Sequence, residues 1–489
     1  MKRFFLFFAL VSLIYTAGSQ NITKTIGQEN KKINVGQING MKILGKDDGL
    51  TIAVTNKYNS VLGNYIKKEC QILALDENTN IVRSLEIPET KDHTIVASSI
   101  YEGKIYILTQ YEKRHDVTFQ RYVIDSKQMT LVGEPTTILS YQTQRKDNDY
   151  NWVEQSPNGL LTGFIHITTN RKSDKFEAYE MLLDEEMNVE WRHEYPIYSL
   201  SNIFVSDDGE ILTFGKSAWQ KGQPSKIYFS LITADNSSDY SEDTRLAITD
   251  SRLISYNNGK LLGTGIGVTP TNNEGVEYFG FVLDTKKSTV NISYQPLTDV
   301  DKNVYSDFDL GRRVITPSTD ALVMRHCKAT DFGGVCTIQQ RWAVQICNQN
   351  GGCSVTYYMS GTIVYGLDDN GEIIWHHPIR SNCLQKNNNL LLANSLLVKG
   401  NDIFFLQSEN PKWPATYDIK KSEKTFKVSK GSKVIGVYHI DANGAISKYN
   451  ELLLKKGILA GSMEVVDDEY IGFLSLGKGA TMIKMSINN

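Results

Sequence analysis

Short apolar segments separated by polar turns recur along the whole chain. In one pattern, an apolar strand leads into a tight Asp/Asn-Gly turn and then a second apolar strand, as in residues 204–212. Asn-Gly and Asp-Gly supply the positive φ that a two-residue hairpin turn needs. Eight copies, two of them degenerate, lie at residues 46–50, 101–105, 155–161, 204–212, 255–262, 318–321, 398–403 and 466–470. This pattern predicts a series of β-hairpins.

A second pattern, an apolar strand that ends in Asp before a polar turn, follows each copy of the first. These strands end at Asp76, Asp125, Asp184, Asp235, Asp284, Asp368 and Asp441, with an imperfect copy at Asn488. An Asp side chain at this point can bond the backbone two residues on and close a hairpin. Two hairpins per repeat give four antiparallel strands, which is the make-up of a propeller blade. We predict an all-β, eight-bladed β-propeller of four-stranded antiparallel blades, or seven blades if two irregular repeats within 314–459 share one.

The last repeat ends after its third strand, at Asn489. Residues 31–36 precede the first complete repeat and have no partner there. We predict that this N-terminal segment supplies the outer strand of the last blade, beside residues 482–487. Such pairing removes an exposed sheet edge.

The N-terminus has the layout of a secretory signal peptide. Lys2 and Arg3 precede a short apolar run over residues 4–15, and small residues precede Gln20. We predict a signal peptide at 1–19 and one propeller domain at 20–489, with an insertion at about 327–360. Because the apolar run is too short to span a bilayer, we expect no membrane span. We expect the mature protein to be secreted or periplasmic, and to be a monomer.

Composition narrows the possible partners and cofactors. The net charge of −3 argues against a surface devoted to nucleic acid. Of six cysteines, Cys70 stands alone and the other five cluster, so we predict disulfides among Cys327, Cys336, Cys347, Cys353 and Cys383 in an oxidising compartment. Their connectivity cannot be read from the sequence. Zinc is the weaker alternative because paired C-x₂₋₄-C units are missing, and we predict no metal.

Long, variable loops are predicted on one face of the propeller, between the second and third strands of a blade and between blades. Function on a rigid scaffold is usually carried by such loops. Their cations and aromatic rings suit an anionic or polyhydroxylated ligand, although an ordinary polar loop surface is the alternative. The candidate ligand-binding residues are Arg114, His115, Arg145, Tyr150, His166, Arg171, Trp219, Arg380 and Trp413.

Two further motifs resemble metal-binding sites but lack features that such sites need. His376 and His377 are adjacent, and neighbouring residues on a strand point to opposite faces, so they should not share a metal ion. Residues 299–310 begin like a calcium loop but lack the Gly at the sixth position and the Glu at the twelfth. We expect the latter segment to be a polar loop between blades.

One blade ending resembles those of quinoprotein-type propellers. Residues 367–375 contain an Asp, a turn with Gly and then Trp375, and residues 183–191 match this pattern more poorly. The resemblance implies the propeller fold. The Trp is not repeated in most blades and the vicinal cysteine pair of that family is missing, so the resemblance does not extend to pyrroloquinoline quinone, and we predict no cofactor.

Two classes of function fit this sequence. The first is a binding or protein-interaction module that holds a protein or glycan partner through the long-loop face. The alternative is a carbohydrate-active enzyme, a polysaccharide lyase or glycoside hydrolase, because several secreted propeller families of that kind are similar in carrying His, Tyr and Arg near the central axis. In that case His115 or His166 would be the general base. The two hypotheses differ in whether a His and a Tyr converge at hydrogen-bonding distance on one face.

Overall fold

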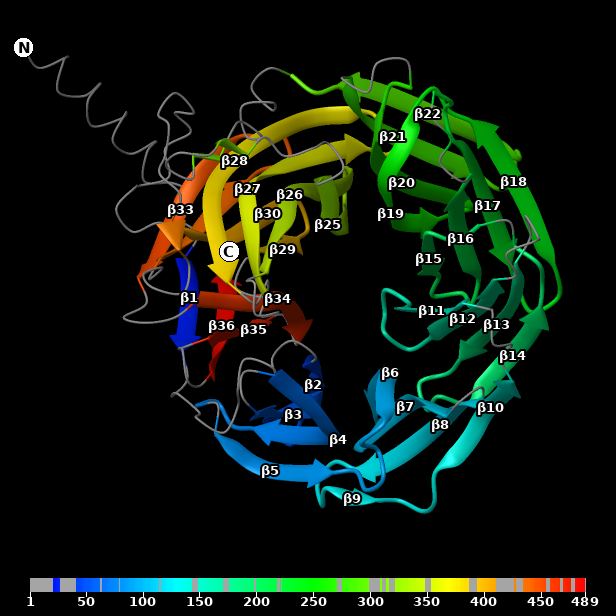
Figure 1. Ribbon diagram of the computed structural model, residues 1–489, viewed down its shortest axis with the longest axis vertical. Helices are drawn as coiled ribbons and strands as arrows, with labels where there is room; N and C mark the ends of the chain where they lie inside the picture. Colours follow the sequence, from blue (N-terminus) through cyan, green and yellow to red (C-terminus); the bar gives the residue numbers. More distant parts are fainter. Residues whose placement is uncertain are drawn as a thin grey trace, which may run out of the picture.

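The computed structural model shows an all-β chain (Figure 1). The described residues are 21–26, 41–61, 64–78, 80–113, 116–142, 148–169, 176–197, 199–217, 220, 222–270, 275–298, 308–309, 314–315, 322–347, 353–386, 394–409, 426–427, 434–453, 458–466, 469–475 and 480–488. No membrane-spanning helix occurs in these segments.

The first five sheets follow one another along the chain as antiparallel meanders, four-stranded except for the second, which has a short fifth strand. The first contains β2 (Lys42–Asp47), β3 (Leu50–Val61), β4 (Asn64–Leu75) and β5 (Ile81–Glu86). The second contains β6 (His93–Tyr101), β7 (Lys104–Lys113), β8 (Asp116–Asp125) and β10 (Thr136–Gln142), and β9 (Thr130–Leu131) also pairs with β8. The third contains β11 (Asn148–Gln155), β12 (Thr162–Thr169), β13 (Glu177–Leu183) and β14 (Val189–Glu194). The fourth contains β15 (Asn202–Val205), β16 (Ile211–Lys216), β17 (Lys226–Ile232) and β18 (Ser237–Asp243), and the fifth contains β19 (Ala247–Asn257), β20 (Lys260–Val268), β21 (Val276–Asp284) and β22 (Thr289–Pro296).

The later sheets are more irregular. A two-stranded pair, β23 (Phe308–Asp309) and β24 (Val314–Ile315), precedes the sixth sheet. The sixth contains β25 (Leu322–Thr330), β26 (Gly333–Cys347), β27 (Cys353–Asp368) and β28 (Ile373–Lys386), and β31 (Phe426–Lys427) pairs parallel to β28. The seventh contains β29 (Asn394–Lys399), β30 (Asp402–Glu409), β32 (Val434–Ile440) and β33 (Ile446–Leu453). The eighth contains β34 (Ile458–Val466), β35 (Glu469–Ser475), β36 (Ala480–Asn488) and β1 (Asn21–Ile26).

The predicted turn chemistry is confirmed at individual positions. Asn258 and Gly259 have φ of 53° and 80°, so both central residues of this hairpin are left-handed, as a type I′ turn requires. In the second pattern, Asp76 Oδ1 accepts hydrogen bonds from the amides of Asn78 and Asn80 at 2.9 and 2.7 Å. The side chain therefore closes the outer hairpin, as the sequence predicts.

The sheets are arranged around a common centre, with the first strand of each innermost and the last outermost (Figure 1). The innermost strands contact one another from sheet to sheet, and β34 of the eighth sheet also contacts β2 of the first. Four-stranded antiparallel sheets arranged around a common centre are typical of a propeller.

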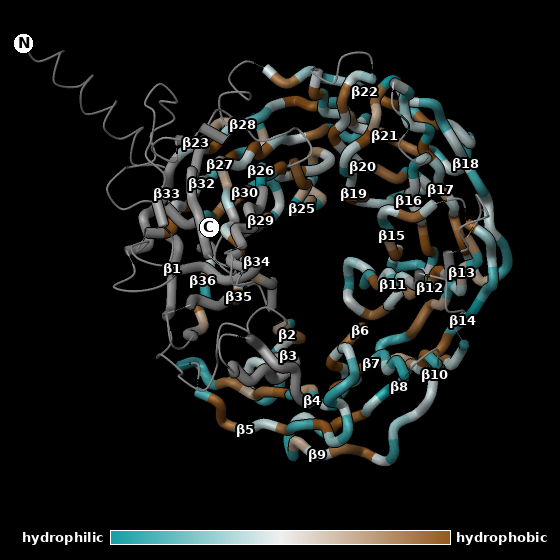
Figure 2. Tube along the Cα trace, in the orientation of Figure 1, coloured by the Kyte–Doolittle hydropathy of each residue, from teal (hydrophilic) through white to brown (hydrophobic). Residues whose placement is uncertain are grey.

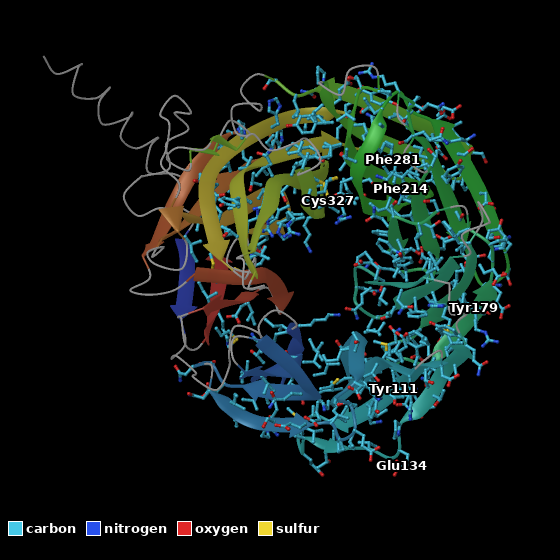
Figure 3. All side chains as sticks on the ribbon, viewed as in Figure 1. Tyr111, Glu134, Tyr179, Phe214, Phe281 and Cys327 are labelled. Carbon is cyan, nitrogen blue, oxygen red and sulfur yellow. A yellow bond between two sulfur atoms is a disulfide. The ribbon has the colours of Figure 1, made fainter. Side chains whose placement is uncertain are left out.

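The hydrophobic core lies between successive sheets rather than at the centre. Apolar residues alternate along the strands (Figure 2) and gather where two sheets face each other. Phe119 of the second sheet meets Phe164 of the third edge to face at 4.8 Å, and Phe214 of the fourth stacks on Phe281 of the fifth at 5.2 Å (Figure 3). Burial of these large rings is the main source of stability between sheets.

Close packing fixes one glycine between the fifth and sixth sheets. A Cβ atom on Gly280 of β21 would overlap the carbonyl oxygen of Gly371, in the turn between β27 and β28. Backbone cannot yield to a new methyl group as a flexible side chain can, so only glycine fits there.

The N-terminal strand that pairs with β36 is not the predicted segment. β1 runs antiparallel to β36, from Asn21 opposite Asn488 to Ile26 opposite Ile483. The predicted segment, residues 31–36, lies outside the described residues. The prediction of an N-terminal strand beside residues 482–487 is correct, but its position is ten residues too far along the chain. Ile22, Thr23 and Thr25 give β1 the β-branched composition that suits a strand.

Candidate functional site

Charged side chains occur on the innermost strands of several sheets. We call five of them the central charged cluster: Lys42 of β2, Glu154 of β11, Arg252 of β19, and Arg325 and Lys328 of β25. Each is exposed or half-exposed. The inner side of an innermost strand has no neighbouring strand in its own sheet, so charges there can stay hydrated.

The carboxyl group of Glu154 is influenced by charges from several other sheets. Its side chain touches solvent, yet the surrounding protein removes enough water to raise the pKa of the carboxyl group. The cations of Lys42, Lys328 and Arg252 oppose this rise. Because these three residues belong to the first, sixth and fifth sheets and Glu154 to the third, charges from three other sheets act on one carboxyl group.

Lys42 is held in place across three sheets. Its Nζ donates to Gln155 Oε1 of the third sheet at 2.6 Å and approaches the Ser98 carbonyl oxygen of the second at 3.5 Å. Gln155 Nε2 donates to the same Ser98 carbonyl oxygen at 3.3 Å. These bonds fix the ammonium group on one side of the cluster.

Arg252 bridges the fourth, fifth and sixth sheets. Its Nη1 donates to Asn202 Oδ1 at 3.0 Å, and its Nη2 lies 3.5 Å from the Met324 carbonyl oxygen. Asp250, whose Oδ1 is 3.7 Å from Arg252 Nη1, accepts a bond from the Met324 amide through Oδ2 at 2.8 Å. The guanidinium is therefore oriented by neighbours on both sides while part of it remains exposed.

Arg325 adds a second guanidinium to the same region. Desolvation lowers the pKa of Arg325, the positive charge of Arg252 lowers it further, and Asp250 opposes both. Two like charges held close together in a partly desolvated region repel each other, and a bound anion would relieve that repulsion. With Asp250 counted, four cations and two carboxylates lie in this region, and the excess of positive charge favours an anionic ligand.

A pocket of about 500 Å³ lies beside the cluster. It is lined by Lys328, Ala329, Thr330, Asp331, Leu396, Leu397, Val398, Gly400 and Met463. These residues come from the inner hairpin of the sixth sheet and from the inner strands of the seventh and eighth. Lys328 thus belongs both to the pocket wall and to the central charged cluster.

Most of the predicted loop residues lie outside the described residues. These are Arg114, His115, Arg145, Arg171, Trp219 and Trp413, so the long-loop face stays a prediction. Of the other three, Tyr150 is exposed on β11, His166 is buried on β12, and Arg380 lies on β28. Tyr150 and His166 are on paired strands, where Tyr150 is opposite Ile167 and His166 is opposite Asn151.

His166 does converge with a tyrosine, but the partner is Tyr141 rather than Tyr150. Tyr141 Oη and Asn151 Oδ1 lie 2.9 and 2.8 Å from His166 Nδ1. Burial lowers the pKa of His166 to about 4, so the imidazole is neutral near pH 7. Because His166 has no exposed surface, it cannot reach the proton of a substrate. The contact joins the second and third sheets and gives no support for a base at this position.

The adjacent histidines behave as predicted. His377 Nε2 lies 2.6 Å from the Gly444 carbonyl oxygen of the seventh sheet, whereas the His376 ring faces Tyr278 of the fifth at 6.3 Å. The described residues contain no group of three or more His, Cys, Asp or Glu side chains placed to hold a metal ion. Residues 299–307 of the calcium-like segment lie outside them.

One disulfide of the cysteine cluster is confirmed. Cys327 and Cys336 are bonded across the β25–β26 pair, where the register places them opposite each other (Figure 3). Cys347 and Cys353 are also opposite each other, at the ends of β26 and β27, and Cys383 lies on β28. Cys70 is fully buried in the core between the first and second sheets.

Sequence reasoning missed the central charged cluster. Each member is a single charge within a strand, and such a residue is usually interpreted as part of a solvated face. A usable signal was present, because Lys42, Glu154, Arg252 and Lys328 all fall on the first strand of their repeats. In a propeller that strand borders the centre, so charged residues on the first strands of different repeats can lie near one another.

The sequence matches no known protein family and no curated protein. Solved structures of similar fold include the WD40 domain of SCAP from fission yeast, at 8% identity and a TM-score of 0.39, covering 96% of this chain and 99% of that one. The β-propeller domain of the Trilobed protease from Pyrococcus furiosus covers 84% of this chain and 95% of its own, at 12% identity and a TM-score of 0.36. Polysaccharide lyase Uly1 covers 96% and 100%, at 10% identity and a TM-score of 0.34. These neighbours are β-propellers, and the likeness concerns the fold alone.

Proposed function

We propose that the chain is an eight-bladed propeller in which β1 completes the last blade, and that it acts as a ligand-binding module. The eight sheets of four or more strands and the contact of β34 with β2 support this blade count. The pairing of β1 with β36 supports the closure.

The proposed ligand is an anion that carries carboxylate groups, such as an acidic glycan, and its site is the central charged cluster. The observation that carries this proposal is the fixed placement of cations on the innermost strands: Lys42 Nζ is held by Gln155 Oε1 at 2.6 Å and Arg252 Nη1 by Asn202 Oδ1 at 3.0 Å, and both charges, with that of Lys328, act on the carboxyl group of Glu154. The carboxyl group of Glu154 thus already interacts with these cations. A ligand carboxylate would find the same cations together with Arg325, and Arg groups bind carboxylates through two parallel bonds.

Isothermal titration calorimetry with an oligogalacturonate tests this proposal, with a neutral oligosaccharide of the same length as the comparison. We expect the acidic glycan to bind and its affinity to fall at about 0.5 M NaCl, because salt screens accessible charges. Arg252→Gln and Arg325→Gln should each weaken binding by about tenfold or more. The control is Arg192→Gln, an exposed residue of β14.

Three results would contradict the anion site. These are equal binding of the neutral glycan, loss of affinity in the Arg192 control equal to that in the cluster variants, and no binding of the acidic glycan. A circular dichroism spectrum of each variant, matched to that of the unchanged protein, ensures that the comparison is made between folded proteins.

We also propose secretion or export to the periplasm, on the evidence of the N-terminal sequence. Expression of the full chain with its leader, followed by sequencing of the mature N-terminus, is the direct test. We expect the mature protein to begin at Gln20, which leaves β1 intact. Recovery of the protein with Met1 or Lys2 at its N-terminus would refute the leader.

A further inference from the structure

The pocket beside Lys328 combines an apolar wall with two opposite charges. Leu396, Leu397 and Met463, each at most 6% exposed, supply apolar surface from the seventh and eighth sheets. Lys328 and Asp331 supply one positive and one negative group from the hairpin of the sixth sheet. Small-molecule sites usually combine apolar surface with a few placed polar groups.

The two charged groups do not neutralise each other. No ion pair joins Lys328 and Asp331, and neither side chain forms a hydrogen bond with another of the described residues. The Asp331 carboxylate lies beside Gly400, where Oδ2 would be 3.7 Å from an added Cβ. Thr330, also in the wall, has a buried hydroxyl group and so adds no accessible polar group to the pocket. The pocket therefore contains two charged groups that a ligand could pair.

The charges of Lys328 and Asp331 determine which kind of ligand the pocket would bind best. A purely apolar ligand would cover both charges without pairing them, and burial of an unpaired charge is unfavourable. A purely anionic ligand would meet Asp331, and a purely cationic one would meet Lys328. A ligand with both a carboxylate and an ammonium group satisfies both side chains, and an apolar part then contacts Leu397 and Met463.

We propose that this pocket binds a small zwitterion with apolar side chains, of the size of a hydrophobic dipeptide. Its carboxylate pairs with Lys328 Nζ, its ammonium group pairs with the Asp331 carboxylate, and its side chains fill the apolar wall. A volume of about 500 Å³ lies within the range of ordinary ligand pockets. This site is separate from the proposed anion site, although the two share Lys328.

Calorimetry with three related probes tests the proposal: Leu-Leu, N-acetyl-Leu-Leu, which has no ammonium group, and Leu-Leu amide, which has no carboxylate. We expect Leu-Leu to bind and each of the others to bind at least about tenfold more weakly, because one charged pair is lost. Asp331→Asn should remove the difference between Leu-Leu and its N-acetyl form. Ala329→Phe, at an exposed position of the wall, should fill the pocket and abolish binding.

Matched controls distinguish this site from general effects and from the anion site. Asp369→Asn changes an exposed carboxylate in the outer hairpin of the same sheet, and Lys104→Gln changes an exposed lysine beside a different turn; both should bind Leu-Leu normally. Equal binding of Leu-Leu and N-acetyl-Leu-Leu, unchanged binding in Asp331→Asn, or no binding of Leu-Leu would each overturn the proposal. Binding of Leu-Leu without binding of oligogalacturonate by the unchanged protein would leave this inference standing by itself, and binding of oligogalacturonate without Leu-Leu would leave only the anion site.

Discussion

Glu180 of β13 is a buried carboxyl group that forms no ion pair with another of the described residues. The side chain has no exposed surface, and its Oε2 accepts a bond from the Tyr195 amide at 3.2 Å. Its Oε1 has no hydrogen-bond partner among the described residues. Burial raises the pKa of Glu180 from 4.5 to about 8, and the nearby carboxylate of Glu194 adds to the rise. The folded protein therefore holds this group protonated near neutral pH.

The raised pKa sets the sign and size of a pH effect on stability. Below about pH 4.5 the carboxyl group is protonated in both the folded and the unfolded chain, so it contributes no pH dependence. Between pH 4.5 and about 8 only the unfolded chain is ionised, so the free energy of unfolding falls by about 1.4 kcal/mol per pH unit. From pH 5 to pH 7 this amounts to roughly 2.5 kcal/mol.

Glu180→Gln removes the ionisable group and keeps the side-chain shape. We expect its free energy of unfolding to rise relative to the unchanged protein by about 2.5 kcal/mol between pH 5 and pH 7, measured by denaturant titration at both values. Glu177→Gln, an exposed position on the same strand, is the control and should show no such change. A difference between Glu180→Gln and the unchanged protein that stays constant with pH would refute the neutral, buried carboxyl group.

Three further results are expected. Gly280→Ala should lower the melting temperature, because the new Cβ meets the Gly371 carbonyl oxygen, and an unchanged melting curve would contradict the close approach. Reductant should lower the free energy of unfolding by about 2 to 3 kcal/mol through loss of the Cys327–Cys336 bond, and a double Cys→Ser variant should not respond to it in denaturant titrations. The folded pKa of His166, near 4, lies below its unfolded value of 6.5, so acid favours the unfolded chain. His166→Gln should lose about 1.6 kcal/mol less stability between pH 6.5 and pH 5, and equal acid sensitivity would count against a buried neutral imidazole.

The parts of the fold that depend on local chemistry could be predicted from the sequence. The turn at Asn258 and Gly259 follows from the backbone freedom of those two residues, and the cap at Asp76 follows from its reach to the next amides. The N-terminal strand could be assigned to the right partner but not to the right residues. Residues 31–36 and Asn21–Ile26 both have strand-compatible composition, and only pairing with β36 selects between them.

The candidate site could not be predicted because it depends on the arrangement of strands in space. Loop composition pointed to residues such as Arg145 and Trp413, because loops are where cations and aromatic rings gather in sequence. The cluster around Glu154 depends on which strands face the centre and on how far Lys42 and Lys328 reach across it, and neither is visible in a linear pattern. The disulfide similarly required the register of β25 against β26, since five cysteines allow many pairings.

The pairing of β1 with β36 has a consequence for biosynthesis. β1 leaves the ribosome long before β36, so this strand must wait for all the intervening sheets to be made before it can form its hydrogen bonds. No other pairing among the described strands spans so much sequence, and contacts of long sequence separation form slowly. The earlier meanders can fold one after another as they emerge, whereas the eighth sheet is completed only once β36 has emerged. Nascent chains stalled before residue 480 would therefore display β1 as an unoccupied strand, open to chaperones or to the same strand of a neighbouring molecule.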